Sequence, residues 1–137
     1  MAEIKSMTIK NTFEEMGVLC GEFHEFLKGM ELASATVYVL DLALEEMVTN
    51  IIKYGYDDKG GHNIRVEVEI DKDAAHMLIE DDGHEFDPLN QAMPDLDRDI
   101  TEREIGGVGI FLTRNMVNEI NYSRENNKNK LRITVNL

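Results

Sequence analysis

Apolar and polar residues alternate in several short segments of this chain, as they do when successive side chains face opposite sides of a β-strand. In "NIRVEVEID", Val66, Val68 and Ile70 share one face, and charged residues share the other. "HMLIED" follows and predicts its antiparallel partner. Residues 1–10 predict a short edge strand, and "EINYSRE" and "KLRITVNL", joined by the polar turn "NNKN", predict two C-terminal strands. Four residues of the last strand are predicted to face the core: Leu131, Ile133, Val135 and Leu137.

The first predicted helix spans about residues 13–28. Thr12 followed by Glu15 is a capping box, and Gly29 lies where the helix should stop. The apolar residues of this segment recur at helical spacing and predict the face that packs on the core. They are Phe13, Met16, Cys20, Phe23, Leu27 and Met30.

A second helix is predicted over about 35–54, with Ser34 as its cap and Gly55 beyond its end. Its apolar stripe is Val37, Leu40, Leu44, Met47, Val48 and Ile51. A long polar loop is predicted over 83–106, because this segment lacks sustained periodicity and carries Gly, Pro and many charges. A third helix follows over about 108–118.

The predicted order is therefore strand, two helices, two strands, loop, helix and two strands. This order favours an α+β fold, a two-layer sandwich in which helices cover one face of a mixed, mostly antiparallel sheet. The chain has 137 residues, the size of one ordinary domain, so we expect a single domain over 1–137.

Composition limits the classes of binding partner and the cellular compartment that we expect for this chain. The net charge of −13 argues against a nucleic-acid or anionic-membrane surface, which would need a basic patch. The single cysteine, Cys20, allows no internal disulfide and favours a reducing, cytoplasmic compartment. The sequence contains neither an apolar run long enough to span a membrane nor a signal-peptide pattern. The four histidines lack the spacing of a zinc site: His24, His62, His76 and His84.

The first candidate for chemistry is the acidic end of one predicted strand, in "MLIEDDGHEFDPL". A period of two places Asp81 on the core face with Ile79, and it places Glu80 and Asp82 on the wet face. An inward carboxylate is costly unless it accepts hydrogen bonds, which the amino group of a base would donate. The alternative is a plain strand end that runs into a turn, and one bulge would exchange Asp81 with Asp82.

The second candidate is a polar stripe on the second helix. Glu46 and Asn50 are one turn apart, and Lys53 lies on about the same side. This stripe is either part of a site or a solvated helix face. Three glycines lie just before or within the first turn of the last helix, where free N–H groups can bind an anion: Gly106, Gly107 and Gly109. A simple loop-to-helix joint is the alternative there.

Together these segments resemble the boxes of the Bergerat-fold, histidine-kinase-like ATPases. An E-x-x-x-N helix, a D-x-G after a strand, a long loop and a G-G-x-G helix start occur in that order. The wider segments "EEMVTNIIKYGY", "DDGHEFDP" and "GGVGIFLTRNMVNEI" resemble the small anti-sigma-factor serine/threonine kinases. The resemblance covers nearly the whole chain.

The resemblance implies a role for each matching residue. Glu46 corresponds to the acid proposed as general base toward the acceptor hydroxyl, and Asn50 to the asparagine that binds Mg²⁺ between the phosphates. Lys53 corresponds to a basic residue that meets a phosphate in some relatives. Asp81 corresponds to the aspartate that accepts a hydrogen bond from the adenine amino group, and Gly83 to the glycine that lets the chain turn under the base.

The same resemblance assigns the phosphates and the lid. The glycines that would cradle the phosphates are Gly106, Gly107 and Gly109. Residues 87–105 correspond to a mobile ATP lid, from which Arg98 or Arg103 would reach a phosphate. Many relatives have D-x-G-x-G, but residue 85 is glutamate here. The D-x-G-x-x-F-D-P form is common among the small anti-sigma kinases.

The function that the resemblance implies is an ATP-dependent protein serine/threonine kinase that uses Mg²⁺. It would phosphorylate a STAS-type anti-anti-sigma protein and sequester a sigma factor, as a homodimer. A nucleotide-binding anti-sigma module without transfer is the alternative. An ATPase fragment that phosphorylates a histidine on another chain is a third possibility, against which Glu46 and the F-D-P signature count.

Overall fold

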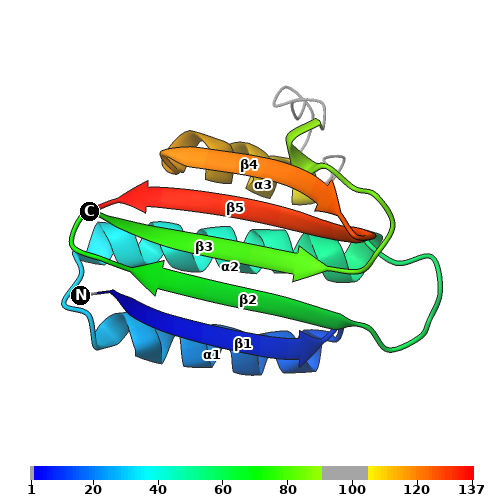
Figure 1. Cartoon of the computed structure of the whole chain (residues 1–137), viewed down its shortest axis with the longest axis horizontal. Coiled ribbons are helices and arrows are strands. Elements are labelled where there is room, and N and C mark those ends of the chain that lie inside the picture. Colours follow the sequence, from blue (N-terminus) through cyan, green and yellow to red (C-terminus); the bar gives the residue numbers. More distant parts are fainter. Residues whose placement is uncertain (1, 91–104) are drawn as a thin grey trace.

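The computed structural model describes residues 2–90 and 105–137. The elements follow one another in the predicted order: β1 (Glu3–Lys10), α1 (Phe13–Lys28), α2 (Ser34–Tyr54), β2 (Asn63–Ile70), β3 (Ala74–Asp81), the 3₁₀ turn η1 (Pro88–Asn90), α3 (Ile105–Met116), β4 (Glu119–Glu125) and β5 (Lys128–Asn136). The strands form one sheet in the order β1-β2-β3-β5-β4 (Figure 1). All its pairings are antiparallel, so the prediction of a mixed sheet is wrong.

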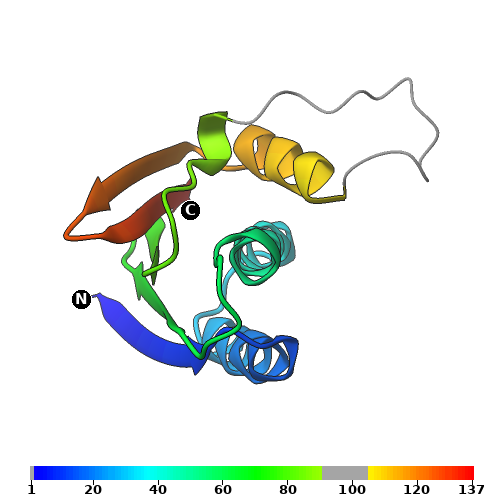
Figure 2. The same ribbon diagram turned by 90° about the vertical axis from the view of Figure 1, so that its right-hand side faces the viewer.

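The predicted two-layer α+β architecture is confirmed. Figure 2 shows the sheet nearly edge-on, with the three helices on one side of it. The alternation of β2 has the predicted result, because Val66, Val68 and Ile70 are buried between the sheet and the helices. Within the described residues, no helix has the length and apolarity needed to cross a membrane.

The start of α1 follows the capping prediction with one change. The Thr12 hydroxyl accepts the Glu15 N–H at 3.2 Å, as expected, but the Glu15 carboxylate accepts the N–H of Lys10 at 2.9 Å. The Glu15 side chain therefore ties the end of β1 to the helix. The predicted core stripe is wrong at Phe13, which is 50% exposed, and it omits Leu19, which is buried. Phe13 is the first residue of the helix, where the chain has only just left the edge of the sheet.

The second helix begins without the predicted cap. Ser34 is already helical, and the residue at the cap position, Ala33, makes no side-chain hydrogen bond. The end is as predicted, since the Gly55 N–H donates to the carbonyl of Ile51 at 2.8 Å. The stripe is buried at four predicted positions and half-buried at Val37 and Ile51; the four are Leu40, Leu44, Met47 and Val48.

The C-terminal hairpin is tighter than predicted. Its turn is two residues, Asn126 and Asn127, with φ of 54° and 61°. Two-residue hairpin turns of this kind need positive φ at both positions, and Asn tolerates it well. The strand therefore starts at Lys128, and its register places Asn129 directly opposite Asp81. Leu137, predicted to face in, follows the end of β5 and is 46% exposed.

Candidate functional site

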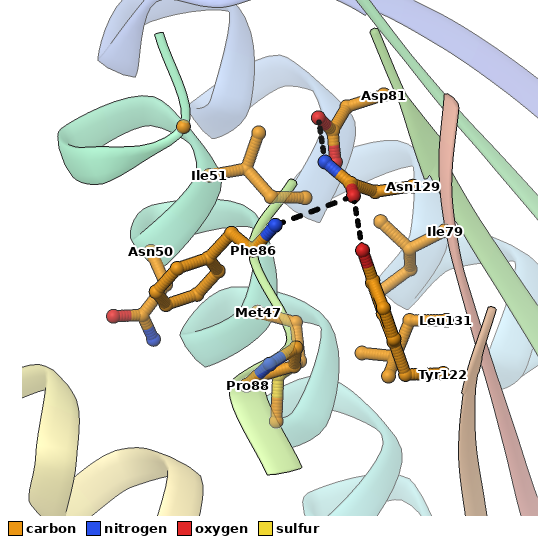
Figure 3. A pocket seen from close by; sticks show the side chains of 11 residues that line it. Met47, Asn50, Ile51, Ile79, Asp81, Phe86, Pro88, Tyr122, Asn129 and Leu131 are labelled. Carbon is orange, nitrogen blue, oxygen red and sulfur yellow. Dashed lines mark hydrogen bonds between the residues drawn. The ribbon is translucent and has the colours of Figure 1, made fainter. Parts of the chain in front are cut away.

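A pocket lies where α2 faces the end of β3, and strands β4 and β5 complete its wall (Figure 3). The loop that follows β3 contributes Phe86 and Pro88 to it. Most of the lining is apolar, and the polar groups are few. The lining residues are Met47, Asn50, Ile51, Gly55, Ile79, Asp81, Phe86, Pro88, Tyr122, Asn129 and Leu131. Apolar walls with a few placed polar groups are typical of small-molecule sites.

Asp81 has the orientation that the alternation predicts. It is 5% exposed and faces the helices, whereas the Asp82 side chain is half exposed. Oδ1 of Asp81 accepts the N–H of Gly83 at 2.9 Å and the amide of Asn129 at 3.0 Å. Burial nevertheless raises the pKa of Asp81 above the usual carboxyl range. Within the part of the chain that the structure describes, the other oxygen, Oδ2, has no hydrogen-bond donor.

Position 83 requires glycine because a side chain has no room there, and not because of its backbone angles. A Cβ atom there would overlap the carbonyl oxygen of Gly55 and lie 2.9 Å from Oδ1 of Asp81. The same Gly55 carbonyl accepts the N–H of His84 at 3.0 Å. The absent side chain thus lets the loop after β3 pack against the end of α2.

Asn50 and Asp81 line one pocket, so the fold brings together two residues that lie far apart in the sequence. Asn50 is only 3% exposed, and its Nδ2 donates to the carbonyl of Glu46 at 2.7 Å. That bond fixes the amide and leaves Oδ1, a suitable oxygen ligand for Mg²⁺. Lys53 is exposed in the last turn of the same helix. The predicted polar stripe therefore combines a buried Asn50 with an exposed Lys53, and it is not a fully solvated helix face.

Glu46 packs against the third helix. A Cβ atom at Gly109 would overlap the Glu46 carboxylate, so this glycine makes the room in which that side chain lies. Burial raises the pKa of Glu46, nearby Glu45 raises it further, and Lys53 opposes them. A carboxylate held with a raised pKa at a helix–helix contact is suited to accept a proton.

The glycines at the start of α3 divide into two groups. Gly106 and Gly107 lie in the first turn, whose N–H groups have no partner within the helix and can bind an anion. Gly109 is one turn further, where its N–H belongs to the helix ladder, and it contacts Glu46 instead. Arg98, Arg103 and most of the predicted lid lie outside the described residues.

The sequence patterns do not reveal all of this pocket. They place Asn129 in a turn, yet it is buried and bonded to Asp81. They predict Tyr122 only as a strand residue and Phe86 only as part of a motif, but both line the pocket. The alternating pattern of β5, extended two residues toward its start, is the available signal for Asn129. The described residues contain no group of His, Cys, Asp or Glu that would hold a metal ion without a ligand.

The fold is a two-layer α+β sandwich with a mostly apolar pocket at one end of the sheet, and comparison with known proteins identifies the family. Residues 9–135 match the family model described as "Histidine kinase-like ATPase domain". The chain therefore belongs to the histidine kinase-like ATPase family, as its motifs predicted.

The curated proteins to which the chain is similar include serine kinases and anti-sigma factors. "Serine/threonine-protein kinase BtrW" of Bordetella bronchiseptica is 25% identical over 71% of this chain and 68% of its own length. "Anti-sigma F factor" of Clostridium novyi is 26% identical over 69% and 66%. "Serine-protein kinase RsbW" of Staphylococcus aureus (strain bovine RF122 / ET3-1) is 32% identical over 61% and 56%. The chain thus spans between about half and two thirds of the length of these relatives.

Proposed function

We propose that this chain is an ATP-dependent protein serine/threonine kinase and anti-sigma regulatory factor. In this proposal it phosphorylates a STAS-type anti-anti-sigma protein and sequesters a sigma factor, working as one domain and as a homodimer in the cytoplasm. The observation that carries the proposal is that one fold holds both the pocket at Asp81 and the Glu46 side chain. The pocket at Asp81 has mostly apolar walls and a buried carboxylate, and Glu46, held against Gly109, lies one helical turn from Asn50.

The chemistry of the pocket lining supports the proposal of an adenine nucleotide. Its walls are apolar, which suits the faces of a flat base, and the acceptor left at the wall is Oδ2 of Asp81. The amino group of adenine is the donor that this oxygen needs. The phosphates would then lie toward the N–H groups at Gly106 and Gly107, with Lys53 as a further cation.

Asn50 would hold Mg²⁺ through Oδ1, because its Nδ2 is engaged by the carbonyl of Glu46. Mg-ATP would supply the phosphoryl group and neutralise its charge. Glu46 would accept the proton of the acceptor hydroxyl while the hydroxyl oxygen bonds to the γ-phosphorus and the bond to ADP breaks. Its raised pKa strengthens it as a base, and the residues around it mainly position the reactants.

The test measures phosphate transfer from labelled Mg-ATP to STAS-domain proteins of the same organism. Glu46→Gln should lower the transfer rate by about 10²- to 10⁴-fold, the usual contribution of a general base, with ADP affinity nearly unchanged. The matched control is Glu22→Gln, because Glu22 is an exposed glutamate on a different helix, α1. Wild-type protein that binds nucleotide but transfers nothing to any STAS partner would overturn the kinase assignment.

That last outcome would favour the alternative, an anti-sigma module that binds nucleotide without transferring its phosphate. The two functions also differ in cells. If Glu46→Gln left regulation of the sigma factor intact, the alternative would be favoured, because transfer would not be needed. The burial of Asp81 would serve both functions, whereas the desolvated position of Glu46 favours the kinase.

A further inference from the structure

One buried amide, that of Asn129, is the centre of the polar groups behind the pocket (Figure 3). Its Nδ2 donates to Oδ1 of Asp81 at 3.0 Å and to the carbonyl of His84 at 2.8 Å. Its Oδ1 accepts the hydroxyl of Tyr122 and a guanidinium N–H of Arg124 at 3.0 Å. A longer contact of 3.4 Å joins the same oxygen to the N–H of Phe86.

The partners leave the amide only one orientation. Both groups that face Nδ2 are acceptors, and the groups that face Oδ1 are donors. Turned over, the amide oxygen would face a carboxylate and a carbonyl, and the NH₂ group would face Tyr122 and Arg124. Tyr122 and Arg124 both come from β4, so the neighbouring strand fixes an amide on β5.

The fixed amide in turn determines how Asp81 meets a ligand. Oδ1 is occupied twice, by Asn129 at 3.0 Å and by Gly83 at 2.9 Å, which are ordinary hydrogen-bond lengths. The carboxylate is therefore held in one rotation, with Oδ2 as the oxygen that remains for the pocket. Arg124 also donates to the carbonyl of Gly83 at 3.0 Å, which fixes the second donor as well.

We propose that Asn129, oriented by Tyr122 and Arg124, is a positioning residue that makes Asp81 a one-oxygen acceptor and so selects adenine over guanine. The inference rests on the proposed function, since it concerns the same nucleotide pocket. Adenine presents an amino donor where guanine presents the O6 acceptor. A carboxylate with a single fixed free oxygen accepts the first and repels the second. A protonated carboxyl could donate to O6 and would discriminate less.

The experiment measures the affinities of ADP and GDP by calorimetry for wild-type protein, Asn129→Ala and Asn129→Asp. Both variants remove the donor to Oδ1, and Asn129→Asp keeps the shape while placing a second carboxyl beside Asp81. Each should weaken ADP binding by about 10- to 100-fold, the scale of a lost hydrogen bond to a charged group, and should lower the ADP/GDP affinity ratio. The matched control is Asn136→Ala, an exposed asparagine on the same strand, which should leave both affinities unchanged.

A pH series separates positioning from general structural support. The charged and titratable groups near Asp81 are Asp82, Arg124 and Tyr56. The bond from Asn129 favours the ionised carboxylate, so removing it should raise the pKa of Asp81 further. ADP binding should then be lost at a higher pH on acidification than in the wild type. A variant that was only less stable would lower affinity without moving that midpoint.

Tyr122→Phe provides a milder variant if the substitutions at Asn129 prevent folding. It removes only the hydroxyl that orients the amide, and it should shift the ADP/GDP affinity ratio in the same direction by a smaller factor. Folded variants with the wild-type ratio and the wild-type pH midpoint would overturn this inference alone. Failure of the wild-type protein to bind ADP would instead overturn the proposed function, and the inference with it.

Discussion

Gly109→Ala should separate catalysis from stability, because the added methyl group meets the side chain of the proposed general base, Glu46, rather than the backbone. A Cβ atom at this position would overlap the end of the Glu46 side chain, and a flexible carboxylate can swing away. Alanine is also favoured over glycine inside a helix by about 0.5–1 kcal/mol. We therefore expect stability to stay level or rise while the general base is displaced.

The expected loss of rate follows from the role assigned to Glu46. A general base contributes about 10²- to 10⁴-fold, so a displaced one should cost at least about 100-fold in phosphate transfer. ADP affinity should change little, because Gly109 lies beyond the free N–H groups of the first turn of α3. Transfer to a STAS partner, ADP calorimetry and urea unfolding together measure the three quantities.

Two controls and a second readout make the prediction refutable. Gly17→Ala and Gly21→Ala introduce the same change in α1, where a Cβ meets nothing within 4 Å, so both should stabilise the fold without affecting transfer. An NMR titration should show the pKa of Glu46 falling toward its ordinary value in Gly109→Ala, because the carboxylate leaves its desolvated position. Transfer close to the wild-type rate, with an unchanged Glu46 pKa, would refute the reasoning.

Three further changes test other parts of the molecule. Asp81→Asn should weaken adenine-nucleotide binding by about 1–3 kcal/mol, whereas Asp82→Asn should not; calorimetry that ranks them the other way would contradict the inward orientation of Asp81. Gly83→Ala should destabilise the fold by about 1–3 kcal/mol in urea unfolding, because its Cβ meets the Gly55 carbonyl, while Gly61→Ala, with open space around it, should stay within about 0.5 kcal/mol. The His62 ring contacts Asp58 at 2.8 Å and Asp82 at 3.2 Å, and the bond to Asp58 raises its pKa. This contribution to stability is complete below the unfolded pKa of about 6.5 and is lost as pH rises through the raised value. NMR should show the His62 pKa falling in Asp58→Asn, and no change would contradict the ion pair.

Alternation and helical spacing predict most of the fold because they report which side chains must avoid water. β2 and β3 pair as expected, and the inward turn of Asp81 follows from its parity with Met77 and Ile79. Helix ends are less predictable. Ser34 has the composition of a cap, yet the chain enters α2 one residue earlier, and α3 starts at Ile105 rather than near 108.

The largest gap concerns Asn129, and its cause is specific. Four consecutive polar residues, "NNKN", do not reveal which two of them make the turn. Only Asn126 and Asn127 of these four adopt positive φ, which shifts the start of β5 toward the turn and pairs Asn129 with Asp81. Strand register is a property of two strands and a turn together, so no single segment could have predicted that contact.

The glycines around the pocket show why a motif predicts a site better than it predicts the physical role of each residue. The motifs predict backbone freedom or phosphate contact for them, yet none of the described glycines has positive φ. Gly55 ends a helix, where a Cβ would lie 2.6 Å from the carbonyl oxygen of Ile51. Gly83 lets two backbone segments meet, and Gly109 makes room for a carboxylate. A side chain at Gly83 would meet backbone that cannot move, whereas one at Gly109 would meet a side chain that can. The first glycine therefore supports the fold and the second supports the proposed chemistry of Glu46, so substitutions at the two should cause losses in different assays.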